Sequence, residues 1–486
     1  MKKIADIILV NPKGFGLIND RTPPLNFLYS TVYLYKDYDI KIIDQRFEKN
    51  WENILLEELR KNPICVGVTS MTGSQLKYAL EISKIVKDNS KVPVVWGGVH
   101  ASLLPNQTIK HKYVDIIVKG EGEVTFQELI KALKEKTSLA DVKGVWYKKG
   151  DRIIATEERE FVNLSQLPDI PWELIDIKKY LFNGEFGKQI DFLTSKGCPN
   201  QCIYCYNNNF NKSKWRAMDS KKTLREIKRL VSLYKIEHIR FQDDAFFVNL
   251  TRAREIFEGI KGISPNLTWS SFGTCISDIK RMDNEYLQAL EKSGCTDILI
   301  GIESGSPKIL KYIKKNNTLQ DIISSNKRLS KTKIRVTYTY MSGFPNETKE
   351  DLKKTIDLFF KLKKDNKNII VGNIKPIISY PGTEFFNIAL KRGLKIPKNL
   401  EEWSSSMYGN FENTNIPWMT KQHKKTLTYL YFATVLLNPN YLFINSKMFN
   451  IISRIVTPFM RWRVKHLNFN FPIFLFMVKY IYKKIN

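Results

Sequence analysis

Three closely spaced cysteines constrain this chain more than any other feature of its sequence. Cys198, Cys202 and Cys205 have C-x3-C-x2-C spacing and follow an apolar strand expected to end near Thr194. Three thiolates on one short loop can bind three irons of a four-iron, four-sulfur cluster, which leaves the fourth iron open to an exogenous ligand. A structural zinc site would bring a fourth Cys or a His at close spacing, and none lies nearby.

The spacing is too specific to arise from unrelated residues. The chain has only six cysteines, so a chance gathering of half of them within one loop is improbable. The loop therefore predicts an iron–sulfur cluster. Because such a cluster requires reduced thiols, we expect a cytosolic compartment.

The motif C-x3-C-x-aromatic-C after a strand resembles the signature of the radical S-adenosylmethionine (SAM) superfamily. The resemblance implies that Cys198, Cys202 and Cys205 bind the cluster, and that the open iron chelates the amino and carboxylate groups of SAM. Electron transfer from the cluster would then cleave SAM to a 5′-deoxyadenosyl radical. It also implies that Tyr204 lies against the adenine.

Residues 1–140 alternate apolar strands with helices, which predicts a Rossmann-like α/β domain with a parallel sheet covered on both faces. Such sheets bind ligands at the carboxyl ends of their strands, where the polar and glycine-rich segments fall here. No G-x-G-x-x-G motif opens a helix after the first strand, so the sequence does not support a dinucleotide site.

Two of these segments, Gly97 to Ser102 (Gly-Gly-x-His-x-Ser) and Gly120 to Glu123 (Gly-Glu-Gly-Glu), resemble the cobalamin-binding domain of one large radical SAM subfamily. That subfamily includes anaerobic magnesium-protoporphyrin monomethyl ester cyclases and radical C-methyltransferases. Glycines at strand ends let the backbone approach a large flat ligand. The alternative is a domain that keeps the fold and has lost cobalamin. The residues that the resemblance assigns to cobalamin are Ser70, Thr72, Gly97, Gly98, His100, Ser102, Gly120, Glu121 and Gly122.

The cobalt is expected to have no lower histidine ligand. Cobalamin domains of mutases carry Asp-x-His-x-x-Gly, whereas the second strand here ends in Asp44-Gln45-Arg46-Phe47. His100 is expected to order its own loop rather than to ligate cobalt.

Residues 141–190 are predicted to be a connector with a hairpin near Lys149, and residues 191–385 alternate strands and helices again. Six β/α units predict a partial (β/α)6 TIM-type barrel, which is the fold of the resembled superfamily. Functional residues of such barrels lie at the carboxyl ends of the strands. The expected strands are 191–195, 237–242, 267–273, 297–302, 333–341 and 369–378.

Several residues at those strand ends match positions of the superfamily. Gln242 and Asp243 correspond to the segment that binds the amino end of SAM, and Glu303 corresponds to a ribose contact. Asp244 is either a helix N-cap or a ligand contact. No further catalytic residue is assigned.

Other strand-end residues carry weaker indications. Tyr338 and Met341 are candidates to line the SAM or substrate cavity, whereas Glu347 and Thr348 are expected to start a helix. The remaining cysteines are expected to be buried apolar thiols; they are Cys65, Cys275 and Cys295.

Residues 386–486 form a basic, aromatic region without Asp or Glu after Glu412. We expect a helical cap over the barrel mouth, with peripheral contact to an anionic membrane as a second hypothesis. Its apolar runs, such as Phe471 to Val478, are too short for a membrane-spanning helix. The net charge of +28 suits several anionic partners, but no recognisable nucleic-acid module is present.

The sequence predicts a cobalamin-dependent radical SAM enzyme that methylates an unactivated carbon of a small-molecule or lipid-like substrate. It would need a reductant such as flavodoxin or ferredoxin. One alternative is a cyclase or oxidase that uses the same radical without methyl transfer. Another is a non-catalytic cobalamin-binding module that docks at membranes.

Overall fold

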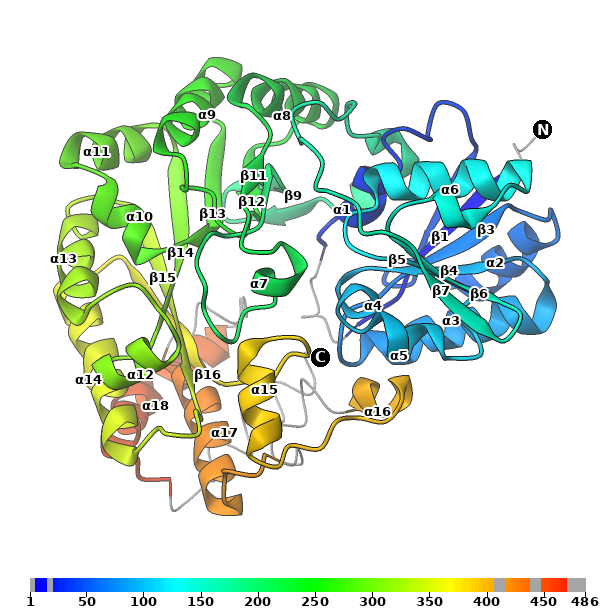
Figure 1. Ribbon diagram of the computed structural model, residues 1–486. Helices are drawn as coiled ribbons and strands as arrows, with labels where there is room; N and C mark the ends of the chain where they lie inside the picture. Colours follow the sequence, from blue (N-terminus) through cyan, green and yellow to red (C-terminus); the bar gives the residue numbers. More distant parts are fainter. Residues whose placement is uncertain (1–4, 15–20, 406–415, 438–446, 470–486) are drawn as a thin grey trace.

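A computed structural model describes residues 5–14, 21–405, 416–437 and 447–469 of the chain. Two α/β units lie side by side, and helices from the C-terminal part of the chain pack on both (Figure 1). The two units correspond to the two α/β domains predicted from the sequence.

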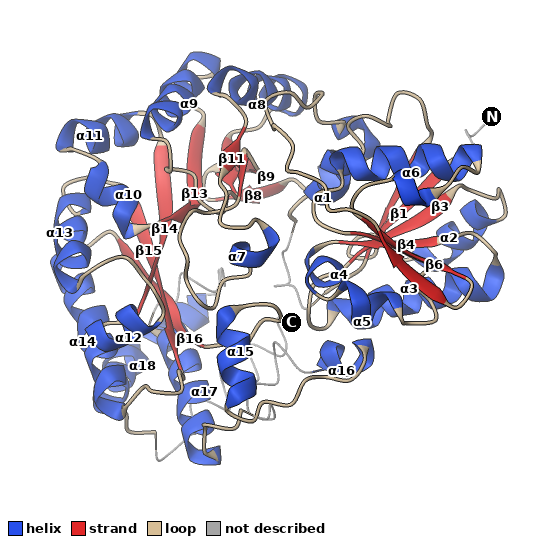
Figure 2. Ribbon diagram, in the orientation of Figure 1, coloured by secondary structure: helices blue, strands red, loops and turns tan. Residues whose placement is uncertain are grey.

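The first unit has one sheet with the strand order β2-β1-β3-β4-β5-β6-β7. Strands β1 to β5 are parallel and their central members are buried, because helices cover both faces (Figure 2). The elements are β1 (Ile7–Asn11), α1 (Leu25–Ser30), β2 (Ile40–Asp44), α2 (Trp51–Leu59), β3 (Cys65–Thr69), α3 (Gln75–Asn89), β4 (Val94–Gly97), α4 (Val99–Leu103), α5 (Pro105–Ile109), β5 (Ile116–Val118) and α6 (Glu123–Glu135).

The predicted hairpin extends this sheet rather than standing apart. Strand β6 (Val145–Lys149) pairs antiparallel with β5 and with β7 (Arg152–Ala155). The first unit therefore continues past residue 140 into the segment predicted to be a connector.

The second unit has a sheet with the order β16-β15-β14-β13-β12-β9-β8. Strands β9 and β12 to β16 pair in parallel in chain order, which confirms the predicted partial barrel. Its strands are β8 (Phe182–Gly184), β9 (Gly187–Phe192), β12 (His238–Phe241), β13 (Thr268–Thr274), β14 (Cys295–Glu303), β15 (Arg335–Ser342) and β16 (Ile369–Pro376), and β10 (Ser195–Lys196) pairs separately with β11 (Arg216–Ala217).

Helices cover the outer face of this sheet, and their apolar stripes explain why (Figure 2). Trp269 of β13, for example, is fully buried and stacks on Phe257. The helices of this unit are α7 (Asn207–Phe210), α8 (Ser220–Tyr234), α9 (Leu250–Ile263), α10 (Ile276–Arg281), α11 (Asn284–Lys292), α12 (Pro307–Tyr312), α13 (Leu319–Leu329) and α14 (Lys349–Asp365). The short α7 does not cover the outer face but lies toward the first unit, where it contacts α4 (Figure 1).

The predicted C-terminal helical region is present as α15 (Glu384–Lys391), α16 (Leu400–Ser405), α17 (Lys421–Leu436) and α18 (Lys447–His466). Helix α16 packs on α3 of the first unit, and α17 packs on the edge strand β16. Trp418 Nε1 donates to Gly343 O at 2.9 Å, beside the carboxyl end of β15. The run Phe471 to Val478 lies outside the described residues. Within the described part, no helix is both long and apolar enough to span a bilayer.

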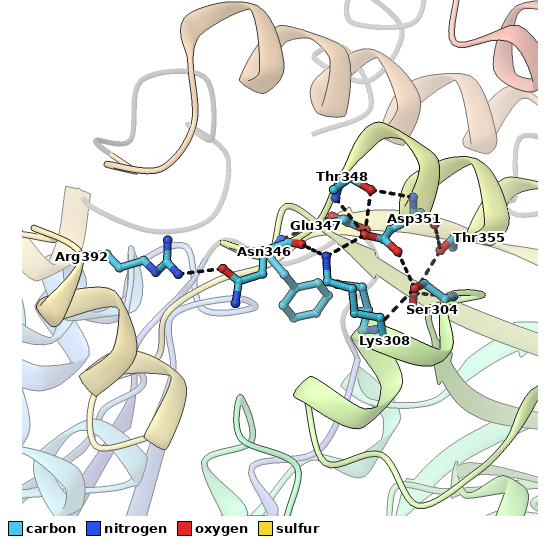
Figure 3. Close-up of polar contacts among 11 residues, drawn as sticks. Ser304, Lys308, Asn346, Glu347, Thr348, Asp351, Thr355 and Arg392 are labelled. Carbon is cyan, nitrogen blue, oxygen red and sulfur yellow. Dashed lines mark hydrogen bonds and ion pairs between the residues drawn. The ribbon is translucent and has the colours of Figure 1, made fainter.

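The turn after β15 is fixed by two carboxylates (Figure 3). Glu347 accepts hydrogen bonds from Ser342 Oγ at 2.8 Å and from the Gly343 N–H, and burial raises the pKa of Glu347 to about 7. Thr348 and Asp351 form a capping box that starts α14. The structure therefore confirms that Glu347 and Thr348 are helix-start residues.

Asp351 also joins this turn to the one after β14. Its carboxylate accepts from Ser306 Oγ at 2.6 Å and from Thr348 Oγ1 at 2.8 Å, and Lys308 Nζ lies 3.4 Å away (Figure 3). Although burial raises it, these donors hold the pKa of Asp351 well below its usual range. Two neighbouring strand ends are thus held in register by one side chain.

We expect Asp351→Ala to destabilise the second unit. The change removes a helix cap and leaves Ser306 without its acceptor, which together cost about 2 kcal/mol. The melting temperature should fall by about 4–8 °C, measured by calorimetry of the full chain. Asp357→Ala on the exposed side of the same helix is the matched control. Equal melting temperatures for the two variants would contradict the assigned role.

Candidate active site

The cysteine loop begins at a position that requires glycine. Strand β10 leads into Gly197, whose φ is +84° and whose added Cβ would lie 2.1 Å from Lys214 O. A side chain there would be strained and would collide with backbone. The chain can therefore turn sharply from the strand into the Cys198 loop only because residue 197 is glycine.

Asp244 ties both ends of the loop together. Its Oδ2 accepts from the Gly197 N–H at 2.8 Å, and its carboxylate also hydrogen-bonds the Tyr206 side chain. Helix α9 is capped instead by Asn249. Asp244 therefore anchors the loop and does not cap α9, whereas its contact with a ligand stays a prediction.

Two later segments hold the middle of the loop. The Ile203 N–H donates to Ile313 O at 3.2 Å, and the Phe385 N–H donates to Ile203 O at 2.9 Å. The loop is thus positioned by elements that follow β14 and β16, far away in sequence.

The three motif cysteines are free thiols on this loop. Burial raises the pKa of Cys205 to about 11 and also raises that of Cys202, so binding iron must displace protons. Among the described residues no group of His, Cys, Asp or Glu is arranged to hold a single metal ion.

Glu303 and Lys315 form a buried ion pair beside the loop. Glu303 Oε1 lies 3.3 Å from Lys315 Nζ, and the two side chains are 9% and 10% exposed. Burial lowers the pKa of Lys315, but Glu303 and the thiols of Cys275 and Cys202 raise it above its ordinary value. A permanent cation therefore stands next to the cysteines, where it can offset the negative charge of thiolates.

Glu303 is held in a strained conformation. Its φ is +72°, and the pairing of β14 with β15 shifts register between Gly301 and Glu303. Such outliers persist where the surrounding structure requires them and are common at functional sites. Tyr204 lies close to both Glu303 and Cys202, whose charges add to burial in raising the pKa of Tyr204. The structure thus brings Tyr204, Glu303 and the cysteine loop together as predicted.

Asp243 lies beneath the loop in a buried network. Its carboxylate accepts from the Thr194 N–H at 3.1 Å, from Thr194 Oγ1 at 2.7 Å and from Ser195 Oγ, and burial raises its pKa. The neighbouring Gln242 is half-buried, and its side chain makes no hydrogen bond within the described residues. A contact of either residue with SAM stays a prediction.

The residues assigned to cobalamin converge at the carboxyl ends of β3, β4 and β5. They support one another through hydrogen bonds that order these loops. The bonds are Ser70 Oγ to Gly97 O (2.8 Å), Thr72 Oγ1 with His100 Nδ1 (2.9 Å), Ser102 Oγ to Gly98 O (2.8 Å) and Gly120 N to Ser102 Oγ (2.9 Å).

This edge presents open backbone where a flat ligand could lie. An added Cβ would meet nothing within 4 Å at Gly120, and only Val118 O at 3.9 Å at Gly97. Met71 is 54% exposed between Ser70 and Thr72. Bare backbone and an exposed apolar side chain fit one face of a corrin ring.

His100 does not face this open surface as a free ligand. It is fully buried, hydrogen-bonds Thr72 and packs edge-on against Trp403 of α16, with ring centroids 5.8 Å apart. Burial lowers the pKa of His100 to about 3, so the ring is neutral. This agrees with the prediction that His100 orders its own loop. At the end of β2, Asp44 is engaged by Asn11 and Arg46.

Charged residues join this edge to the cysteine loop. Lys196, two residues before Cys198, pairs with Glu123 and lies 3.5 Å from Glu121 Oε1, and Arg216 Nη1 lies 2.6 Å from the same oxygen. Helix α4 also contacts α7, which follows the loop. Glu121, predicted to bind cofactor, is thus engaged in ion pairs between the two units.

One cysteine prediction is wrong. Cys65 and Cys295 are buried in the sheets as expected. Cys275, which directly follows β13, is only partly buried. Its Sγ lies 3.3 Å from Asn200 Nδ2, and its thiol interacts with that of Cys198. Its position at the end of a predicted barrel strand was the signal that could have found it. No sequence feature singled out Lys315 as a site residue.

Tyr338 also lies elsewhere than predicted. Its hydroxyl donates to Asn326 of α13 at 3.1 Å, so it points to the helix layer. Side chains alternate along a strand, and Met341 therefore belongs to the opposite, inward face.

Two family models match consecutive parts of the chain. The B12 binding domain matches residues 17–130, and the Radical SAM superfamily matches residues 192–359. These are the two units that meet at Lys196.

Two relatives align with most of this chain. An uncharacterized methyltransferase of Pyrococcus horikoshii is 30% identical over 83% of this chain and 87% of its own length. The anaerobic magnesium-protoporphyrin IX monomethyl ester cyclase of Synechocystis is 25% identical over 79% of this chain and 77% of its own.

The fold matches that of solved cobalamin-dependent enzymes. OxsB, solved with aqua-cobalamin and SAM, has a TM-score of 0.72 at 19% identity, with 96% of this chain and 72% of that one covered. TsrM of Kitasatospora setae, a radical SAM methyltransferase solved with cobalamin and a [4Fe-4S] cluster, has a TM-score of 0.66 at 18% identity, with 80% and 75% covered. The chain belongs to the family of radical SAM enzymes with an N-terminal cobalamin-binding domain.

Proposed function

We propose that this protein is a cobalamin-dependent radical SAM methyltransferase that methylates an unactivated carbon of a small-molecule substrate. The proposal rests on one observation: the predicted cobalamin site of the first unit lies next to the cysteine loop of the second. Helix α4, which follows Gly97 and Gly98 at the open edge of the first sheet, contacts α7, which follows the cysteine loop, and the ion pairs of Lys196 join the two units. A radical formed at one site and a methyl donor held at the other would share one substrate.

The chain's own residues position the reactants. Cys198, Cys202 and Cys205 would hold the cluster, Tyr204 would stack on the adenine, and Glu303 would offer acceptor oxygens to the ribose. The buried Lys315 cation balances negative charge at this point. When bound, the cluster, SAM and cobalamin supply the electron, the radical and the methyl group. A low-potential reductant such as flavodoxin or ferredoxin completes the system.

Methyl transfer is favoured by the relatives. Besides the Pyrococcus protein, cytidylyl-2-hydroxyethylphosphonate methyltransferase of Streptomyces wedmorensis is 24% identical over 65% of this chain. A cyclase that uses the radical without methyl transfer is the second candidate, supported by the similarity to the Synechocystis enzyme. The two candidates differ in one measurable result: with SAM labelled in its methyl group, the label appears in the product of a methyltransferase but not in that of a cyclase.

Contact with an anionic membrane remains a secondary proposal. Helix α18 exposes Phe459 and Trp462, at 46% and 50%, beside the exposed Arg461. Aromatic and basic side chains on one helix suit a membrane surface. Flotation with anionic liposomes tests it.

The cluster proposal predicts that Cys202→Ala abolishes SAM cleavage. Anaerobic reconstitution should give about four irons per chain in the wild-type protein and no cluster in the variant. 5′-Deoxyadenosine formation under dithionite is the readout. Cys65→Ala, which removes a thiol from the first sheet, is the control and should cleave SAM normally. Cleavage by the Cys202 variant would refute the proposal.

The cobalamin proposal predicts that Gly97→Leu prevents cobalamin retention. The new side chain would fill the open space beside Gly97, so the visible absorbance of bound cobalamin should disappear while iron content stays unchanged. Gly262→Leu is the control, because Gly262 also faces open space, on α9. Equal cobalamin contents in the two variants would count against this site.

Lys196→Met should uncouple the two sites. Misplacement by about 1 Å can cost about 100-fold in rate, so methyl transfer from SAM to cob(I)alamin, followed by absorbance, should slow by about 10-fold to 100-fold. Iron and cobalamin contents should not change. Lys212→Met, which breaks an exposed pair with Glu158, is the control. A wild-type rate in the Lys196 variant would show that these ion pairs do not position the sites.

A further inference from the structure

Cys275 stands among the residues of the cluster site although it lies outside the motif. The Asn200 side-chain amide donates to Cys275 Sγ at 3.3 Å and to Cys198 Sγ at 3.5 Å, and the two thiols interact directly. Asn200 belongs to the motif loop itself. Cys198 and Cys275 are 77 residues apart in the sequence, yet both sulfurs accept from the same side-chain amide.

The neighbours of Cys275 place it on the side of the loop where SAM is expected. Its thiol is close enough to Cys202 and Lys315 for their charges to interact. Lys315 in turn pairs with Glu303, the residue assigned to the ribose. Cys275 is thus a neighbour both of the motif cysteines and of the Lys315 that pairs with Glu303.

Hydrogen bonds fix the backbone at Cys275, and this constrains where its side chain can lie. The Cys275 N–H donates to Asp278 Oδ2 at 2.9 Å at the start of α10. Arg281 holds Asp278 at 2.9 Å and also donates to Phe247 O at 2.7 Å. Beside the thiol, a cavity of about 210 Å³ is lined by residues that include Pro199, Asn200 and Arg281.

We propose that Cys275 is a fourth thiolate ligand, which binds the open iron of the cluster until SAM displaces it. The inference rests on the proposed function, because it assumes that the three motif cysteines hold a cluster. It also requires no change of oxidation state. On cluster assembly the Cys275 S–H bond breaks, the proton leaves to solvent and an Fe–S bond forms.

SAM binding would reverse this exchange. The Fe–S bond to Cys275 breaks as the amino and carboxylate groups of SAM bind the iron, and the released thiolate is stabilised by Lys315 or takes up a proton. The consequence is a resting cluster that is fully ligated and protected. An open iron would arise only when SAM is present to occupy it.

The test compares Cys275→Ala with Cys295→Ala in the full-length reconstituted protein. Cys295 is the matched control, because it is a buried thiol of the same barrel on β14. Without SAM, each protein is treated with ferricyanide, and loss of one iron is followed by the [3Fe-4S] EPR signal. We expect Cys275→Ala to lose that iron about 10-fold faster than the wild type or more, and Cys295→Ala to match the wild type.

A second readout uses the reduced cluster. Without SAM, the EPR spectrum of Cys275→Ala should differ from that of the wild type, and with saturating SAM the two should coincide. Equal rates of iron loss together with identical spectra in the absence of SAM would overturn the inference. Failure of the wild-type protein to assemble any cluster would instead refute the proposed function, so the two failures are distinguishable.

Discussion

The arrangement of this protein depends on the buried charges at Lys196. This one side chain precedes the cysteine loop and pairs with Glu123, the first residue of α6 in the other unit. Burying an ion pair costs desolvation free energy that the attraction between the charges only partly offsets, so the main effect of the pair is to specify geometry. Exposed pairs such as Lys84 with Asp88 contribute little to stability or to geometry.

A second charge arrangement defines the cluster site. Glu303 is strained and buried, and it is compensated by Lys315, which in turn stands beside the cysteines. A negative cluster in a low-dielectric barrel needs such a cation, since an uncompensated buried charge is costly. The ion pair therefore links cluster binding to the ribose contact assigned to Glu303, and both would respond to the same ligand.

Local patterns predicted most of the fold. Alternating apolar strands and helices gave the order of both units, and the cysteine spacing located the loop, because these signals repeat within a few residues. Lys315 and the pairing of Glu121 with Arg216 were not predictable, since each depends on segments that meet only in the folded chain. Glu121 shows the difference most clearly: its motif indicated a cofactor contact, which stays a prediction, and only the folded structure shows that its carboxylate joins the two units. The prediction that Tyr338 lines the cavity was wrong for a simpler reason: side chains alternate along a strand, and that of Tyr338 points outward to the helix layer.

The cluster and the cobalamin are expected to face one shared space between the two units. The most direct measurement is EPR of the protein loaded with both cofactors and reduced to the paramagnetic cluster and cob(II)alamin. We expect dipolar broadening or splitting of both signals, relative to samples loaded with one cofactor alone. Two signals that simply add, with no interaction between them, would show that the two cofactors do not share this space.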